Sequence, residues 1–215
     1  ISYAENTTST VTTVTSTDVD ASSTATYSLS GTDADDFTID SSTGVLSFSS
    51  SPNYELPTDS DVDNVYVVIV TVTDNGSLTD TQTITVTVTE VNDAPEITAP
   101  GSGETASVSV SEGQTAATDV NASDADGDTL TYSIIGGADQ ASFEINSSTG
   151  DLDFDKTDPP PDFELVGAKV FDVEVSVSDG ELSDIQTIKV TLEDKNDPPV
   201  PNVFVSMEED VYKAG

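Results

Sequence analysis

The chain has 215 residues and a formal charge of −36, from 41 acidic and 5 basic residues, and it contains neither Cys nor His. This charge excludes a nucleic-acid surface, which needs Lys and Arg against phosphates, and it disfavours anionic membranes. Without Cys there are no disulfides, and without His the commonest general base and transition-metal ligand is missing.

The first half of the chain reads as a series of short β-strands. Apolar and polar residues alternate with period two, the pattern of strands with one buried face. Asn75-Gly76 marks a turn before the last strand. The predicted strands are Ser2–Ala4, Thr10–Thr15, Ala25–Leu29, Phe37–Ile39, Val45–Phe48, Val65–Thr73 and Thr83–Val88.

The second half repeats the first. Strands are predicted at Val170–Ser178 and Ile188–Glu193, with the turn Asp179-Gly180 before the last one. No segment has helical periodicity. The segment Thr89–Pro95 returns as Leu192–Pro199, which places domains at residues 1–94 and 95–198. Residues 199–215 then form a linker and the first strand, Val203–Glu209, of a third repeat.

Acidic and amide residues recur at loop positions, which a repeated core cannot explain. The recurring motifs are an early Glu (Glu5 and Glu112), an aromatic-Glu pair (Tyr54-Glu55 and Phe163-Glu164), Asn-Asp (Asn92-Asp93 and Asn196-Asp197), Asp-x-Asp (Asp18/Asp20 and Asp124/Asp126) and a strand-end Asp (Asp74 and Asp179). Calcium takes six to eight oxygen ligands, which these motifs supply together if they converge.

These five motifs, each present twice and in the same order, resemble cadherin repeats over essentially the whole chain. Asn53-Tyr54-Glu55 and the run from Asp124 to Tyr132 are similar to the repeats of large bacterial surface adhesins. The resemblance implies two tandem seven-stranded antiparallel Greek-key β-sandwiches, cadherin-like and Ig-like, with Ca²⁺ bound between successive repeats.

The resemblance also implies the ligands of that calcium site. Side-chain ligands carried over are Glu5, Asn53, Glu55, Asn92, Asp93, Asp124, Asp126 and Asp179, with backbone carbonyls near Val91 and Ala94. Asn53 stands where the family often has Asp, as Asp162 does in the second repeat, so it offers an oxygen with less charge.

Each motif alone also has a structural explanation. Tyr54 and Phe163 are expected to be core aromatics, and Asp74 and Asp179 suit turns. Asp128 is expected to cap a turn or to lie in solvent. An EF-hand beginning at Asp124 is rejected, because its twelfth position is Ile135. A further acidic cluster, Asp59, Asp61 and Asp63, is either a second cation site or a solvated loop.

We therefore expect a calcium-dependent extracellular adhesion or stalk module, a fragment of a larger secreted or surface protein, in which calcium makes the repeat array rigid. The expected partners are neighbouring repeats of the same chain, with cell-surface glycan or homophilic contacts as further candidates. A glycan- or partner-binding module is the alternative, but it is poorly supplied with 13 aromatic residues and no Trp. An enzyme is not expected, because catalytic pairs are not normally duplicated in every repeat.

Overall fold

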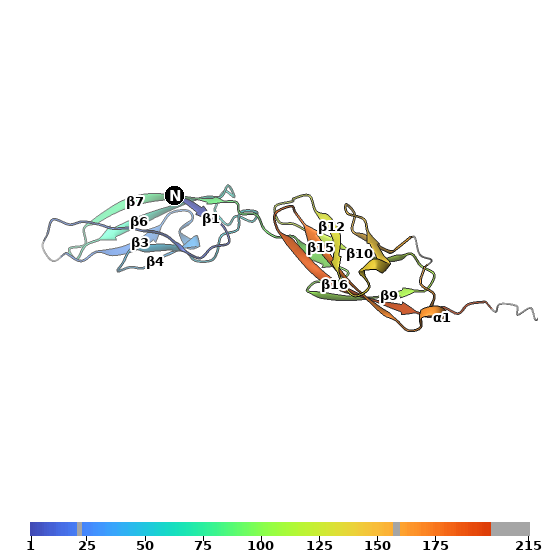
Figure 1. Cartoon of the computed structure of the whole chain (residues 1–215). Helices are drawn as coiled ribbons and strands as arrows, with labels where there is room; N and C mark the ends of the chain where they lie inside the picture. The colour runs from blue at the N-terminus through green and yellow to red at the C-terminus, as the bar shows by residue number, and fades with distance from the viewer. Residues whose placement is uncertain (21–22, 157–159, 199–215) are drawn as a thin grey trace, which may run out of the picture. The chain divides into compact units, whose positions relative to one another are not determined.

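The computed structural model describes residues 1–20, 23–156 and 160–198, and the predicted strand Val203–Glu209 and the 199–215 linker lie outside these ranges. The chain divides into two compact units (Figure 1). Unit 1 comprises residues 1–95 together with the loops 124–129 and 179–182, and unit 2 comprises the remainder. Two loops of the second sequence repeat thus belong to unit 1.

Unit 1 is a sandwich of seven strands. They are β1 (Ser2–Ala4), β2 (Thr10–Thr13), β3 (Thr26–Ser30), β4 (Phe37–Ile39), β5 (Val45–Phe48), β6 (Val65–Thr73) and β7 (Thr79–Thr89), with a 3₁₀ turn at Ala34–Asp36. One sheet has the order β1-β7-β6-β3 and the other β2-β5-β4. Pairing is antiparallel except for β1, which runs parallel to β7.

The core of unit 1 follows from the period-two pattern. Alternate residues of β6 and β7, such as Tyr66, Val68 and Val86, are 0% exposed, and Leu46 of the second sheet is equally buried. Phe37 meets Tyr66 edge-on across the sandwich, with the ring centroids 6.0 Å apart. Burial of these side chains holds the two sheets together and fixes which residues remain outside.

Unit 2 repeats this arrangement and adds two strands. Its elements are β8 (Glu96–Ala99), β9 (Thr105–Ser111), β10 (Ala116–Asp119), β11 (Asn121–Ser123), β12 (Thr131–Gly136), a 3₁₀ turn (Gln140–Ser142), β13 (Phe143–Ile145), β14 (Asp151–Phe154), α1 (Phe163–Val166), β15 (Val170–Ser178) and β16 (Ser183–Glu193). The sheets are β12-β15-β16-β9, β10-β14-β13 and the extra pair β11-β8.

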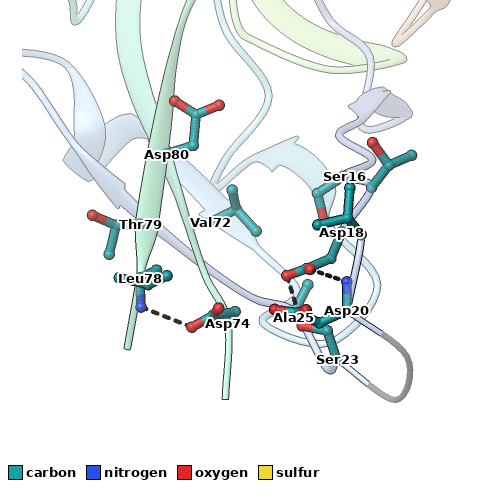
Figure 2. A pocket seen from close by; sticks show the side chains of 12 residues that line it. Ser16, Asp18, Asp20, Ser23, Ala25, Val72, Asp74, Leu78, Thr79 and Asp80 are labelled. Atoms are coloured by element: carbon teal, nitrogen blue, oxygen red, sulfur yellow. Dashed lines mark hydrogen bonds between the residues drawn. The ribbon is translucent and has the colours of Figure 1, made fainter. Parts of the chain in front are cut away.

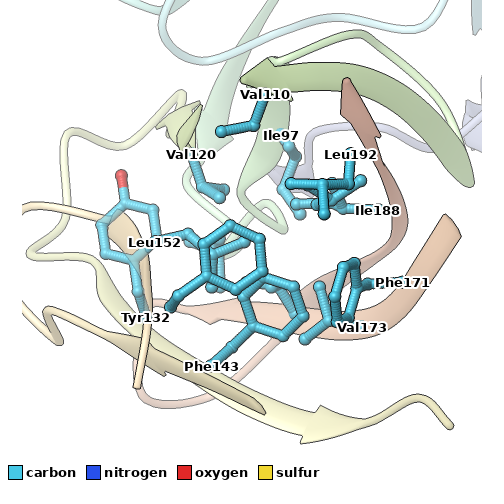
Figure 3. Close-up of a cluster of buried hydrophobic side chains, with 14 residues drawn as sticks. Ile97, Val110, Val120, Tyr132, Phe143, Leu152, Phe171, Val173, Ile188 and Leu192 are labelled. Carbon is cyan, nitrogen blue, oxygen red and sulfur yellow. The ribbon is translucent and has the colours of Figure 1, made fainter. Parts of the chain in front are cut away.

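In the core of unit 2, aromatic rings pack against Val, Ile and Leu side chains from the surrounding strands (Figure 3). Phe143 stacks on Phe154 with a centroid distance of 4.8 Å, and Phe171 meets Phe143 edge-on. Ile97 of β8 is 1% exposed and belongs to this core. The extra strand is therefore held by burial of an apolar side chain.

The predicted fold class, two tandem β-sandwiches, is confirmed. Among the described residues, unit 1 has the seven expected strands and unit 2 has nine, because β8 and β11 form an additional pair. A single helical turn, α1, was not predicted, since four residues are too few to show a period; Asp162 caps it by accepting a hydrogen bond from Leu165 N. No helix in the described part of the chain is long and apolar enough to cross a membrane.

Candidate metal centre

Glu5 is the structural anchor of an acidic centre in unit 1. It follows β1 and is 1% exposed. Its Oε1 accepts a hydrogen bond from Val91 N at 2.8 Å, and its Oε2 accepts one from Tyr54 N at 2.6 Å. One carboxylate thus ties the end of β1 to the loop after β5 and to the segment after β7, and this brings the neighbouring acids together.

Two further carboxylates converge on Glu5. Glu5, Glu55 and Asp93 each offer an oxygen within 4.8 Å of the others. Asn6 Nδ2 donates to Asp93 Oδ1 at 2.9 Å, whereas the buried Oε2 of Glu55 has no hydrogen-bond partner within residues 1–20, 23–156 and 160–198. Three acids so close repel one another unless protons or a cation neutralise them.

The loop 124–129 brings a second group of carboxylates into unit 1. Asp124, Asp126 and Asp128 also offer oxygens within 4.8 Å of one another. Asp93 N donates to Asp126 Oδ2 at 2.8 Å, which links the two groups. Asp124 Oδ2 and Asp126 Oδ1 are buried, and neither has a hydrogen-bond partner in the part of the chain that the structure describes.

Asp128 is a residue that the sequence analysis undervalued. It is exposed, as expected for a solvent residue, but its carboxylate belongs to the same group as Asp124 and Asp126. Its backbone N donates to Asp124 Oδ1 at 3.2 Å, so the loop folds back on itself. The Asp-x-Asp-Gly-Asp spacing is a sequence signal for a cation ligand at Asp128. It was read only as the start of an EF-hand, which Ile135 excludes.

Asp179, in the loop 179–182, contacts Asn92, which follows β7. Asn92 Nδ2 donates to Asp179 Oδ2 at 2.9 Å, and Asp179 Oδ1 accepts from Glu181 N and Leu182 N at 2.6 Å each. These hydrogen bonds, that of Asn92 foremost, lower the pKa of Asp179. Asp179 therefore stays ionised and serves both as the turn residue and as a candidate ligand.

The remaining predicted ligands are positioned less clearly. Asn53 Oδ1 accepts from Leu56 N at 2.6 Å, so its oxygen already closes a turn. The carbonyls of Val91 and Ala94 stay predictions; the contact described for Val91 is made by its backbone N, which donates to Glu5. The prediction that Tyr54 is a core aromatic is wrong: it is 39% exposed, because its backbone N reaches Glu5 while its ring lies outside. Phe163 is half-buried against the core of unit 2, as predicted.

Crowding shifts the acid–base behaviour of the centre. Partial burial raises the pKa of Glu55, and the negative charges of Glu5 and Asp126 raise it further. Burial is also the main cause of the raised pKa of Asp93, with the charges of Glu5, Asp126 and Asp124 adding to it. Both groups thus hold their protons more tightly in the folded protein than in the unfolded chain.

The raised pKa values make two quantities depend on pH. As the pH falls, stability in chelator should rise, whereas calcium affinity should fall. Because the folded-state pKa values of Glu55 and Asp93 are raised, these groups destabilise the fold at neutral pH, and the penalty disappears as the pH falls through those values. We expect the melting temperature in chelator to rise as the pH falls from 7 to the ordinary Glu pKa of 4.5. Calcium affinity, measured by calorimetry, should fall several-fold over the same range, because protons compete for the same oxygens. A calcium affinity that is constant over this range would contradict the assignment.

Unit 2 builds the first half of the same centre again. Glu112 Oε1 accepts from Lys195 N and its Oε2 accepts from Phe163 N, both at 2.7 Å, as Glu5 does with Val91 and Tyr54. Glu112, Glu164 and Asp197 offer oxygens within 4.8 Å of one another. The early Glu of each repeat therefore accepts the same pair of backbone hydrogen bonds in both units.

The counterparts of Asp124, Asp126 and Asp179 in the first repeat lie around an open hollow of unit 1 (Figure 2). Asp18 accepts from Asp20 N and from Ser23 Oγ, at 2.8 and 2.9 Å, while Asp74 Oδ1 accepts from Leu78 N at 2.7 Å. Unlike the oxygens of Asp124 and Asp126, none of theirs is both buried and without a partner among the described residues.

The further acidic cluster is a folded turn. Asp59 is 3% exposed and accepts from Asp63 N and Asn64 N, at 2.9 and 3.2 Å. Oxygens of Asp59, Asp61 and Asp63 lie within 4.8 Å of one another, and the charge of Asp63 is the largest cause of the raised pKa of Asp61. The hydrogen bonds explain Asp59 structurally, and an ion here stays a prediction.

Comparisons with known proteins agree with this architecture. Residues 1–89 match the family model described as a cadherin domain. Residues 92–191 match the model described as a bacterial Ig domain, a different description from the cadherin-like repeat predicted there. No curated protein matches the sequence.

Among solved structures, the chain is similar to human protocadherin-24 repeats EC1-2, with a TM-score of 0.57 and 20% identity over 92% of this chain and 94% of that one. It is similar to the human desmocollin-1 ectodomain, with a TM-score of 0.55 and 25% identity over 92% of this chain and 39% of that one. For mouse cadherin-23 EC22-24 the TM-score is 0.49 and the identity 23%, over 90% of this chain and 62% of that one.

The chain thus spans less than two thirds of the cadherin-23 and desmocollin-1 structures. The first part of the chain thus matches a cadherin domain model and the second part a bacterial Ig domain model, and the solved structures with a similar fold include cadherin ectodomain repeats.

Proposed function

We propose that the acidic centre of unit 1 binds calcium and that the chain is a calcium-dependent extracellular adhesion or stalk module. The observation that carries the proposal is a set of three buried carboxylate oxygens, on Glu55, Asp124 and Asp126, that have no hydrogen-bond partner among the described residues. A buried charge without a partner is costly, so such oxygens call for a cation. A donor set of carboxylates without His or Cys suits a hard cation such as Ca²⁺.

The ligands proposed for calcium are Glu5, Glu55, Asp93, Asp124, Asp126 and Asp179, with Asp128 as an addition from the structure. Asn92 acts mainly by orienting Asp179, and Asn53 by closing its own turn. A divalent cation here supplies positive charge that offsets the repulsion among these acids.

The mechanical consequence comes from where the ligands lie in the sequence. Glu5, Glu55 and Asp93 come from the first repeat, while Asp124, Asp126 and Asp179 come from the second. When calcium holds both sets, the connecting segment around Asn92–Pro95 loses freedom. Without calcium the carboxylates repel, and this segment flexes.

Small-angle scattering of the whole chain tests the proposal. We expect millimolar calcium to narrow the distribution of particle dimensions, or to lengthen the particle, relative to chelator, since extracellular calcium modules bind at about 0.1–1 mM. NaCl at matched ionic strength is the control, because a chain with a charge of −36 also responds to simple screening. Identical scattering in calcium, in chelator and in matched NaCl would rule out calcium-dependent stiffening.

A further inference from the structure

The turn between β6 and β7 carries the dipeptide Asn75-Gly76 at an exposed tip. One hydrogen bond closes the turn, from Ser77 N to the carbonyl of Asp74 at 3.1 Å. A second runs from Leu78 N to Asp74 Oδ1 at 2.7 Å. Neither bond engages Gly76 N, and no hydrogen bond of that N–H is found within residues 1–20, 23–156 and 160–198. The backbone nitrogen that follows Asn75 is therefore available as a nucleophile.

The side chain of Asn75 is held more loosely than those of five other asparagines. Its Oδ1 lies 3.5 Å from Ser23 Oγ, at the limit of a hydrogen bond. The other amides make hydrogen bonds of 2.6 to 3.0 Å, and they belong to Asn6, Asn53, Asn64, Asn92 and Asn146. Because the amide of Asn75 can rotate, its Cγ can approach the backbone nitrogen of the next residue.

Gly76 removes the steric obstacle to that approach. It has no Cβ to shield its nitrogen, and it can adopt backbone conformations that other residues avoid. An added Cβ would lie 3.3 Å from Asp74 Oδ1, the end of a side chain that can shift by a small distance. Gly76→Ala is therefore compatible with the turn, and it chiefly changes access to the nitrogen.

The equivalent turn between β15 and β16 shows that the tip stays exposed when another segment contacts the turn. There Asn92 Nδ2 donates to Asp179 Oδ2 at 2.9 Å, yet residues 180 and 181 are exposed. Asp179 holds the place of Asp74, since each follows the last residue of the penultimate strand. A segment that contacted Asp74 in the same way would leave Asn75-Gly76 accessible to water.

We propose that Asn75 is a site of spontaneous deamidation. Gly76 N attacks Cγ of Asn75, so that a bond forms between these two atoms and the bond from Cγ to Nδ2 breaks. Nδ2 leaves as ammonia with the proton of Gly76 N, and a five-membered succinimide ring remains. Water then opens the ring at either carbonyl, which gives an aspartyl or an isoaspartyl linkage at position 75. The attack is intramolecular, and water is the only co-reactant.

The reaction changes both the charge and the backbone of the turn. Ser23 Oγ, which faces Asn75 Oδ1, also donates to Asp18 Oδ2 at 2.9 Å, so the new carboxylate joins existing ones. Figure 2 shows Asp18 and Asp74 lining one hollow. An isoaspartyl linkage also inserts the side-chain methylene into the backbone. The lengthened turn then no longer supports both hydrogen bonds that Asp74 accepts.

The first experiment incubates the whole chain at neutral pH and follows its chymotryptic peptides by mass spectrometry, which detects the replacement of NH₂ by OH. We expect Asn75 to lose its amide at least about tenfold faster than Asn146. Asn146 is the matched control: it is exposed and precedes the small residue Ser147, but its Oδ1 accepts from two backbone N–H groups, at 3.0 and 3.3 Å. Gly76→Ala should slow the loss at Asn75 to the rate at Asn146. Equal rates at the two sites, or a rate that Gly76→Ala leaves unchanged, would overturn the proposal.

The second experiment separates the new linkage from the new charge. The isoaspartyl form is purified from the incubated chain, and freshly prepared Asn75→Asp carries the same charge on an ordinary backbone. We expect hydrogen exchange at Ser77 N and Leu78 N to be several-fold faster in the isoaspartyl form than in Asn75→Asp, because their acceptors on Asp74 are displaced. Equal exchange in the two forms would refute the predicted change in the turn.

Discussion

Glu5→Ala is expected to destabilise unit 1 more than loss of any other acid. The substitution leaves Val91 N and Tyr54 N without their acceptor. Each unsatisfied group costs about 1–3 kcal/mol, so the two together cost about 2–6 kcal/mol, a large part of a typical folding free energy. In chelator, relief of the repulsion on Glu55 and Asp93 offsets part of this cost, so the difference from the unmodified chain should be larger in calcium.

Glu112→Ala is the matched control for Glu5→Ala. It removes the same two kinds of hydrogen bond, from Lys195 N and Phe163 N, in unit 2. Hydrogen exchange of each unit's strands should show the loss in unit 2 alone, with the calcium affinity of the unit 1 centre preserved. If Glu112→Ala weakened that calcium site as much as Glu5→Ala does, Glu5 would have no special role in it.

Asp126→Asn is expected to weaken calcium binding by at least tenfold, about 1.4 kcal/mol. The amide keeps an oxygen that can accept from Asp93 N, so the fold is retained while one ligand charge is lost. Asp126 is half-buried, and its Oδ1 is buried with no partner among the residues described. Its charge is therefore costly without an ion and favourable with one. Calorimetric titration of the whole chain measures the change.

Asp128→Asn is the control for Asp126→Asn, since it changes the net charge by the same amount. Asp128 is exposed, so water competes with it for the ion and the loss of affinity should be smaller. Equal affinities in the two variants would mean that total charge, and not the position of Asp126, decides binding.

The sequence predicted the strands well where alternation was strong. Ser2–Ala4, Phe37–Ile39, Val45–Phe48, Val65–Thr73 and Val170–Ser178 are found with the predicted bounds. The last strand of each unit was predicted too short, because exposed residues such as Thr79 and Gln82 leave no apolar trace. Strand β8 was missed, because its single buried residue, Ile97, is flanked by prolines and gives no period.

The sequence named candidate acids of the centre, but it did not predict the hydrogen bonds that position them. Repetition identified Glu5, Glu55 and Asp93, because chance does not duplicate loop acids in register. The role of Glu5 as an acceptor for two backbone N–H groups could not be predicted, since those groups belong to residues 49 and 86 positions away. The exposure of Tyr54 depends on loop conformation, which no side-chain pattern encodes.

The parallel pairing of β1 with β7 and of β9 with β16 determines how each unit bears tension. In unit 2, β9 and β16 run side by side over seven residue pairs, from Thr187 opposite Thr105 to Glu193 opposite Ser111. A pull on the start of β9 and on the end of β16 acts along the strands in opposite directions. The ladder is then loaded in shear, so its hydrogen bonds must fail together and not one after another.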